Sequence, residues 1–118
     1  MKTKHILEAQ QFTPEFVGEF NQTVSSLKKQ EDLSGKGSFV ESLHGRSLSS
    51  CFYQESLRTR MSFARAAQLL GMTVFETTSG GRFSSQAPGE CLDHSIRFQC
   101  ECGFDVIALR WREAGSAK

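Results

Sequence analysis

The chain has 118 residues, a mass of 13.2 kDa and a formal net charge of +1, from 14 basic and 13 acidic residues. This near-neutral balance argues against a dedicated binder of nucleic acid or anionic membranes, since both concentrate surplus Lys and Arg. No apolar run approaches the roughly 20 residues of a membrane span, and no signal-peptide core follows the first residues. We therefore expect a cytoplasmic protein of one domain that binds neither nucleic acid nor membrane.

The four cysteines argue against a metal centre. They are Cys51, Cys91, Cys100 and Cys102. The last two are separated by one residue, and no second Cys or His pair stands at zinc-ligand spacing from them. Without a secretory segment, we expect four reduced thiols, mostly in the core, and no metal.

The first predicted helix covers residues 13–30. Thr13 suits the N-cap and Pro14 the first helical position. Apolar residues then recur at helical spacing, namely Phe16, Val17, Phe20, Val24 and Leu27. At the other end, Lys28 and Lys29 are expected to complement the negative end of the helix dipole.

Beyond a flexible connection at 34–38 and a turn at 43–46, strands and helices alternate. The predicted elements are strands at 47–53, 72–77 and 105–110, and helices at 58–70 and 90–102. Gly71 and Gly103 follow these two helices where a C′ glycine belongs. Strands separated by single helices imply right-handed crossovers. The sequence therefore predicts an α/β fold, a three-layer, doubly wound parallel sheet.

The apolar pattern also predicts which sides are buried. For the helix at 58–70 these are Phe63, Ala66, Ala67 and Leu70. For the helix at 90–102 they are Leu92, Ile96 and Cys100, while Asp93, Arg97 and Glu101 are spaced for ion pairs. The strand at 105–110 is nearly all apolar, which is typical of parallel strands buried on both faces.

The junction after the first strand carries the chemistry. In α/β sheets, ligands bind beyond the carboxyl ends of the strands, where a helix N-terminus attracts anions. Ser56, Arg58, Thr59 and Arg60 supply two hydroxyls and two guanidinium groups there. Such groups bind phosphate or carboxylate oxygens, but a capped helix with a solvated Arg face is an equally good interpretation from spacing alone. Neither glycine-rich nucleotide motif occurs, so nothing favours ATP or NAD.

The same junction resembles a family signature, F-x-[EK]-x-S-[TG]-R-T. Phe52, Ser56, Arg58 and Thr59 match it, and Arg60, Ser62 and Phe63 continue the usual run. The chain is similar to the N-terminal, carbamoyl-phosphate-binding domain of the aspartate/ornithine carbamoyltransferases. Further resemblances are the opening strand at 5–7, the helix end at 69–71, the helix entry at 89–93 and the strand at 105–110. Ser-Cys-Phe at 50–52 and the His-Ile-Leu start are closer to the aspartate branch.

The resemblance implies transfer without a cofactor or covalent intermediate, through positioning and through donors aimed at developing negative charge. It implies that Ser56 and the Leu57 N–H hold the phosphate of carbamoyl phosphate. Arg58 would stabilise the departing phosphate, and Thr59 would bridge the phosphate and the carbonyl oxygen. Arg110, at the end of the third strand, would polarise that carbonyl.

The resemblance also implies a homotrimer with shared active sites, in which Ser84 reaches a neighbour's site. Pro88 stands where the family has a loop lysine, and proline supplies neither a charge nor a donor. Gln54 and Leu57 are milder departures. Trp111 stands where the aspartate branch often has His, outside the ligand shell.

The third predicted strand ends eight residues before Lys118. We therefore expect residues 1–118 to be a truncated carbamoyl-phosphate-binding domain, without the amino-acid-binding domain. The expected function is the N-terminal part of aspartate carbamoyltransferase, which makes N-carbamoyl-aspartate in de novo pyrimidine biosynthesis. Its partners would be carbamoyl phosphate, an amino acid and further regulatory or paralogous subunits. Two alternatives stay open: an ornithine or related amino-acid carbamoyltransferase, and a non-catalytic paralogue that keeps the fold and the assembly surface.

Overall fold

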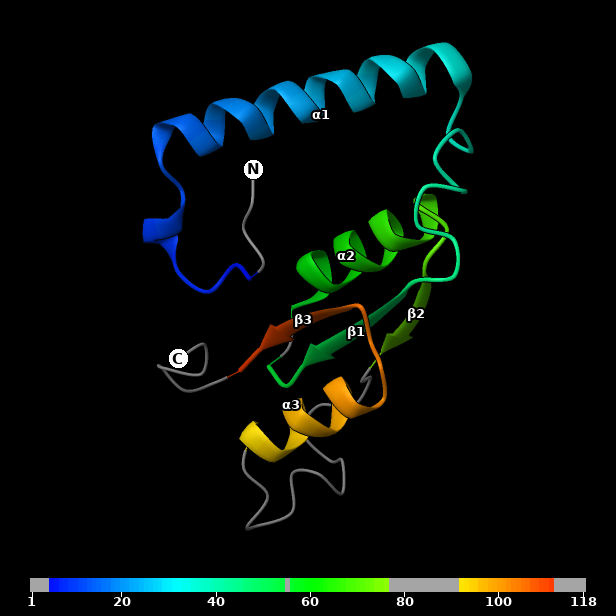
Figure 1. The fold of residues 1–118 in the computed structure, drawn as a ribbon. Helices are drawn as coiled ribbons and strands as arrows, with labels where there is room; N and C mark the ends of the chain where they lie inside the picture. Colours follow the sequence, from blue (N-terminus) through cyan, green and yellow to red (C-terminus); the bar gives the residue numbers. More distant parts are fainter. Residues whose placement is uncertain (1–4, 55, 77–91, 112–118) are drawn as a thin grey trace. The chain divides into compact units, whose positions relative to one another are not determined.

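The structure is a computed structural model that describes residues 5–54, 56–76 and 92–111 (Figure 1). These residues belong to two compact units, one up to Ser38 and one from Phe39 onward. Within this described part of the chain, no helix is both long and apolar enough to cross a membrane. Each unit is built from the elements that follow.

The first unit consists of a 3-10 turn, η1 (Ala9–Gln11), and one long helix, α1 (Pro14–Ser34). The predicted start is confirmed, because the Thr13 hydroxyl accepts a hydrogen bond from the Phe16 N–H at 3.2 Å. The helix runs further than predicted and ends at Gly35, whose φ of 84° is in the left-handed region.

Two features of this unit differ from the sequence-based expectations. Because α1 continues to Ser34, its last turn contains no basic residue, and the expected role of Lys28 and Lys29 at the helix end is wrong. Residues 5–8 form no strand. Instead, the Gln11 side chain accepts hydrogen bonds from two backbone N–H groups of this segment.

The second unit is a parallel sheet with one helix on each face. Its strands stand in the order β2-β1-β3, so the first strand is central. In Figure 1 the two helices lie on opposite sides of the strands, which confirms the predicted three-layer, doubly wound α/β architecture. The elements are β1 (Ser47–Phe52), α2 (Leu57–Leu69), β2 (Thr73–Glu76), α3 (Leu92–Glu101) and β3 (Val106–Arg110).

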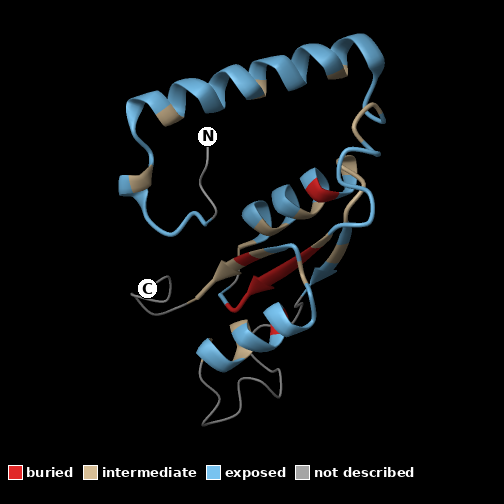
Figure 2. Ribbon diagram, viewed as in Figure 1, coloured by how far each residue is buried: buried red, intermediate tan, exposed pale blue. Residues whose placement is uncertain are grey.

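Burial is concentrated on β1, as Figure 2 shows, because this strand has neighbours at both edges and a helix on each face. Successive side chains of a strand point to opposite faces. Leu48 and Phe52 pack with Ala67 of α2 and with Ala108 of β3. On the opposite face, Ser49 and Cys51 meet α3.

The contact with α3 is polar, which the apolar pattern did not predict. Gln99 is buried, and its Oε1 accepts hydrogen bonds from the Ser49 hydroxyl at 2.5 Å and the Cys51 thiol at 2.9 Å. Cys100, expected on the inner side, is exposed. The face of β1 that packs against α3 carries hydroxyl and thiol groups. A side-chain amide, which can hydrogen-bond to them, is therefore a better neighbour there than an apolar side chain.

Other burial predictions need similar correction. On α2 only Ala67 is fully buried, while Phe63 is 46% exposed and Ala66 is exposed. Within the described residues, strand β3 is not buried on both faces, because Val106 is 44% exposed. Of the cysteines the structure describes, Cys51 is buried but Cys100 and Cys102 are exposed, so most are not in the core; Cys91 lies outside the described residues.

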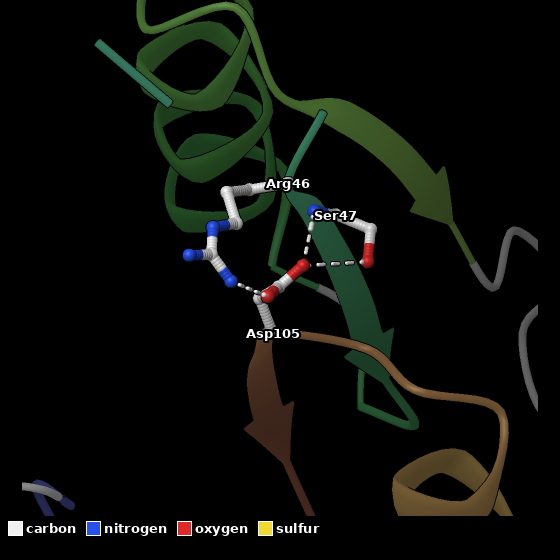
Figure 3. A network of polar contacts seen from close by, with 3 residues as sticks. All are labelled: Arg46, Ser47 and Asp105. Carbon is white, nitrogen blue, oxygen red and sulfur yellow. Dashed lines mark hydrogen bonds and ion pairs between the residues drawn. The ribbon is translucent and has the colours of Figure 1, made fainter. Parts of the chain in front are cut away.

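A polar network joins the amino ends of β1 and β3 (Figure 3). One oxygen of the Asp105 carboxylate accepts from Arg46 Nη1 at 2.8 Å, and the other accepts from the Ser47 N–H at 2.8 Å. The hydrogen bond from the Arg46 guanidinium, followed by that from the Ser47 N–H, lowers the pKa of Asp105 below its ordinary value, while desolvation acts in the opposite direction. Asp105 precedes β3 and ties it to the central strand.

This network should make folding stability depend on pH in acid. Because the pKa of Asp105 is lower in the folded chain, its contribution to stability is complete above the unfolded value and is lost as pH falls through the folded one. We expect Asp105→Asn to be less stable at neutral pH and to lose less stability between pH ~7 and pH ~3. Urea denaturation at a series of pH values measures this difference.

Asp93→Asn is the matched control. Asp93 pairs with Arg97 at 2.9 Å on the surface of α3, with both side chains mostly exposed. Exposed ion pairs contribute little to stability, so this variant should keep the acid dependence of the unmodified protein. Equal slopes for Asp105→Asn and the unmodified protein would show that the network does not carry the effect.

Candidate functional site

The winding of the sheet reverses between β1 and β3. From β1 the chain passes through α2 to β2 on one side, and then through α3 to β3 on the other side of β1. In open α/β sheets, ligands bind at the carboxyl ends of the two strands that flank such a reversal. Phe52 is paired with Arg110 at this edge, and the Tyr53 N–H donates to the Arg110 carbonyl at 3.0 Å. The predicted site residues thus follow β1 or end β3.

The N-terminus of α2 is not a simply capped helix. Ser56 is the N-cap residue, and its carbonyl accepts the first helical hydrogen bond, from the Arg60 N–H at 3.1 Å. Its hydroxyl makes no capping bond to the backbone and instead donates to the Thr59 hydroxyl at 3.0 Å. The N–H groups of a first helical turn have no partner within the helix. This arrangement favours the anion-site interpretation over the capped-helix one.

The cationic and hydroxyl groups at this edge are accessible. Leu57 is 64% exposed, Arg58 and Thr59 are exposed, and Ser56 and Arg110 are half-buried. No carboxylate among the described residues forms an ion pair with Arg58 or Arg110. The ion pairs in the described part of the chain involve Arg46 and Arg97 instead. A helix N-terminus with two such arginines attracts an anion, and its guanidinium forks match phosphate oxygens.

The structure brings the predicted residues to one edge but does not include all of them. Four belong to the start of α2, namely Ser56, Leu57, Arg58 and Thr59, and Arg110 ends the neighbouring strand. Ser84 and Pro88 lie outside the described residues. Among the residues that are described, no three His, Cys, Asp or Glu side chains gather as metal ligands would.

One surface hollow among the described residues contains none of the predicted site residues. It lies along one side of α1, on a single helix, and carries no group of residues with evident chemistry. Its lining residues are Glu19, Gln22, Thr23, Ser26, Leu27 and Gln30. The sheet edge, where charge and free backbone donors converge, is the better candidate site.

Sequence reasoning missed an aromatic contact at the site. Tyr53 directly follows β1 and Trp111 directly follows β3, and their rings meet edge to face with centroids 4.8 Å apart. The Tyr53 hydroxyl lies 2.8 Å from the Ser95 hydroxyl of α3. The available signal was that the chain's only Tyr and only Trp each stand at the carboxyl end of a predicted strand.

Comparison with known proteins agrees with this geometry. A sequence model described as aspartate/ornithine carbamoyltransferase, carbamoyl-P binding domain, matches residues 4–118. Aspartate carbamoyltransferase 1, chloroplastic, of Pisum sativum is 37% identical over 113 residues, which are 96% of this chain and 28% of that protein. The aspartate carbamoyltransferase catalytic subunit of Chloroflexus aggregans is 32% identical, over 98% of this chain and 36% of its own length.

A solved structure gives the same result for the fold. The catalytic subunit of the M. jannaschii aspartate transcarbamoylase superposes with a TM-score of 0.76 at 31% identity, over 97% of this chain and 36% of that one. The chain thus spans about a third of the length of the relatives it matches. Because the family match covers nearly the whole sequence, the chain belongs to the aspartate/ornithine carbamoyltransferase family and corresponds to its carbamoyl-phosphate-binding domain.

Proposed function

We propose that this chain is the carbamoyl-phosphate-binding part of an aspartate carbamoyltransferase. In that reaction the amine of L-aspartate attacks the carbonyl carbon of carbamoyl phosphate and loses a proton. The bond from that carbon to the bridging oxygen breaks, and N-carbamoyl-aspartate and phosphate are released. The observation that carries the proposal is the position of Ser56–Thr59 and Arg110 on either side of the reversal between β1 and β3.

The site groups suit the charge that develops in this reaction. The Ser56 hydroxyl and the Leu57 N–H would hold the phosphate, and Arg58 would stabilise it as it leaves. Thr59 would bridge the phosphate and the carbonyl oxygen, and Arg110 would polarise the carbonyl. No nucleophilic side chain is required, because fixed donors can hold the substrate and stabilise the tetrahedral intermediate.

The remaining parts of the proposal extend beyond the described residues. The aspartate would be bound by a second domain outside these 118 residues, and the assembly would be a homotrimer in which Ser84 completes a neighbouring site. Three of the curated relatives are named catalytic subunits, which supports assembly with further subunits. The pathway would be de novo pyrimidine biosynthesis. We propose the cytoplasm as its location, although the plant relatives are named chloroplastic.

Product analysis tests the choice of amino acid. The full-length protein is supplied with carbamoyl phosphate and either L-aspartate or L-ornithine, and the products are separated by mass. We expect N-carbamoyl-aspartate only, because the relatives reported above are named aspartate carbamoyltransferases. Citrulline formation would favour the ornithine branch instead.

A non-catalytic paralogue is the second candidate, and Pro88 favours it. A proline at the expected lysine position removes one cation directed at the phosphate. Such a paralogue would assemble and yet form neither product. In that case Pro88→Lys separates a missing cation from a wider loss, because it restores turnover only if the rest of the site is intact.

A further inference from the structure

Tyr53, which directly follows β1, contacts the end of β3 and the helix α3. Its backbone N–H donates to the Arg110 carbonyl at 3.0 Å, which extends the β1–β3 ladder by one hydrogen bond. Its ring packs edge to face against Trp111 at an interplanar angle of 75°. Its hydroxyl forms a 2.8 Å hydrogen bond with that of Ser95, near the end of the first turn of α3. Only 8% of the residue is exposed.

Two of these contacts hold the backbone on the carboxyl side of Arg110. The carbonyl of Arg110 accepts from Tyr53, and the next residue, Trp111, packs on the Tyr53 ring. Arg110 is the last residue of β3, which lies at an edge of the sheet formed by the described residues, and strand ends are among the places where a fold opens first. The aromatic contact adds a side-chain restraint to the backbone hydrogen bonds at the strand end that carries this guanidinium.

The hydroxyl adds a restraint that core packing alone does not need. A phenylalanine would fill the same space, whereas a tyrosine also bonds Ser95 and so ties α3 to the end of β1. We propose that Tyr53 is a positioning residue, which holds Arg110 in place for carbamoyl phosphate through Trp111 and Ser95. This inference rests on the proposed function, since it assumes that Arg110 binds that ligand.

The test is a double-mutant cycle in the full-length protein, in which isothermal titration calorimetry measures the affinity for carbamoyl phosphate. The four proteins are the unmodified one, Tyr53→Leu, Arg110→Ala and the double variant. We expect Tyr53→Leu to weaken binding ~10-fold when Arg110 is present and less than ~2-fold when it is absent, because a positioning effect needs the group that it positions. Equal weakening in both backgrounds would overturn the proposal.

Phe75→Leu controls for a general loss of stability. Phe75 of β2 and Phe104 form a second edge-to-face pair, with centroids 5.1 Å apart, that includes no residue of the candidate site. Phe75 is 53% exposed, so its loss should lower the melting temperature by less than the loss of Tyr53 does, while carbamoyl phosphate binding stays within ~2-fold. A Phe75→Leu variant that weakens binding as much as Tyr53→Leu does would mean that Tyr53 acts only through the stability of the fold.

Tyr53→Phe keeps the proposal testable if Tyr53→Leu fails to fold. This variant retains the ring and loses the bond to Ser95, so it should restore most of the binding and match Ser95→Ala, at ~3-fold weaker than the unmodified protein. The variant that combines Tyr53→Phe with Ser95→Ala should bind carbamoyl phosphate no more weakly than either single variant. Additive losses would overturn the role of the hydroxyl pair.

The outcome for the unmodified protein separates the two proposals. If it binds no carbamoyl phosphate, or if Arg110→Ala binds as well as the unmodified protein, the proposed function of the site fails and the inference about Tyr53 fails with it. If Arg110→Ala weakens binding and Tyr53→Leu does not, the site stands and only the positioning role is wrong.

Discussion

Arg58→Ala in the full-length protein is expected to lower kcat/KM for N-carbamoyl-aspartate formation ~10³-fold, about 4 kcal/mol of transition-state stabilisation. Arg58 lies in the first turn of α2, at the carboxyl edge of the sheet, and its side chain is exposed. There its guanidinium can stabilise the negative charge that develops on the departing phosphate. Steady-state rates at varied carbamoyl phosphate concentration measure the effect. Survival of the activity within a few-fold would show that the assigned role is wrong.

Two variants make that result specific. Arg65→Ala removes an exposed guanidinium two turns further along α2, away from the sheet edge, and should change kcat/KM less than ~2-fold. Arg58→Lys keeps the charge but loses the planar fork, so we expect ~10-fold to 100-fold loss. A similar loss for Arg58→Ala and Arg65→Ala would indicate a general effect of positive charge on α2.

Gly71→Ala is expected to destabilise the fold by about 4 kcal/mol. A loss of this size is exceptional for a single substitution and indicates a specific steric conflict. Gly71 follows α2 with φ +82°, a conformation that L side chains rarely adopt, and an added Cβ would lie 1.7 Å from the Val40 carbonyl oxygen. That oxygen belongs to the backbone, so relief requires movement of the segment that leads to β1. The free energy of unfolding in urea, followed by far-ultraviolet circular dichroism, measures the loss.

Gly103→Ala separates the two causes of that loss. Gly103 follows α3 with the same φ of +82°, but an added Cβ would meet nothing within 4 Å. It therefore reports the cost of the left-handed conformation alone, which is about 1 to 2 kcal/mol. Equal losses at the two glycines would show that the approach of Val40 has no energetic consequence.

The sequence by itself determined the local elements and the chemistry of the motif. Thr13 and Pro14 predicted the start of α1, and Gly71 and Gly103 predicted the ends of α2 and α3. Such signals depend on capping and on glycine conformation, which are properties of neighbouring residues. The alternation of strands and helices was sufficient for the fold class, and the Ser56–Thr59 motif was sufficient for the family.

Burial could not be predicted from the sequence, because it depends on which strand is central. The spacing of α3 favoured Cys100 as an inner residue, whereas Gln99 is buried against the hydroxyl and thiol of β1. Strand β3 is as apolar as a central strand but lies at an edge of the sheet formed by the described residues. The spacing of apolar residues predicts the buried side of a helix to within about one residue. Which of two adjacent residues is buried then depends on the chemistry of the strand that faces the helix.

Only the tertiary structure decided how the ends of the strands are arranged. The order β2-β1-β3 sets the reversal of winding between β1 and β3 and thus puts Arg110 beside the strand that leads to Ser56. The contacts of Tyr53 with Trp111 and Ser95 join residues 42 or more positions apart in the sequence. Local patterns carry no information on such pairings, because a pairing depends on how the strands are ordered across the whole sheet.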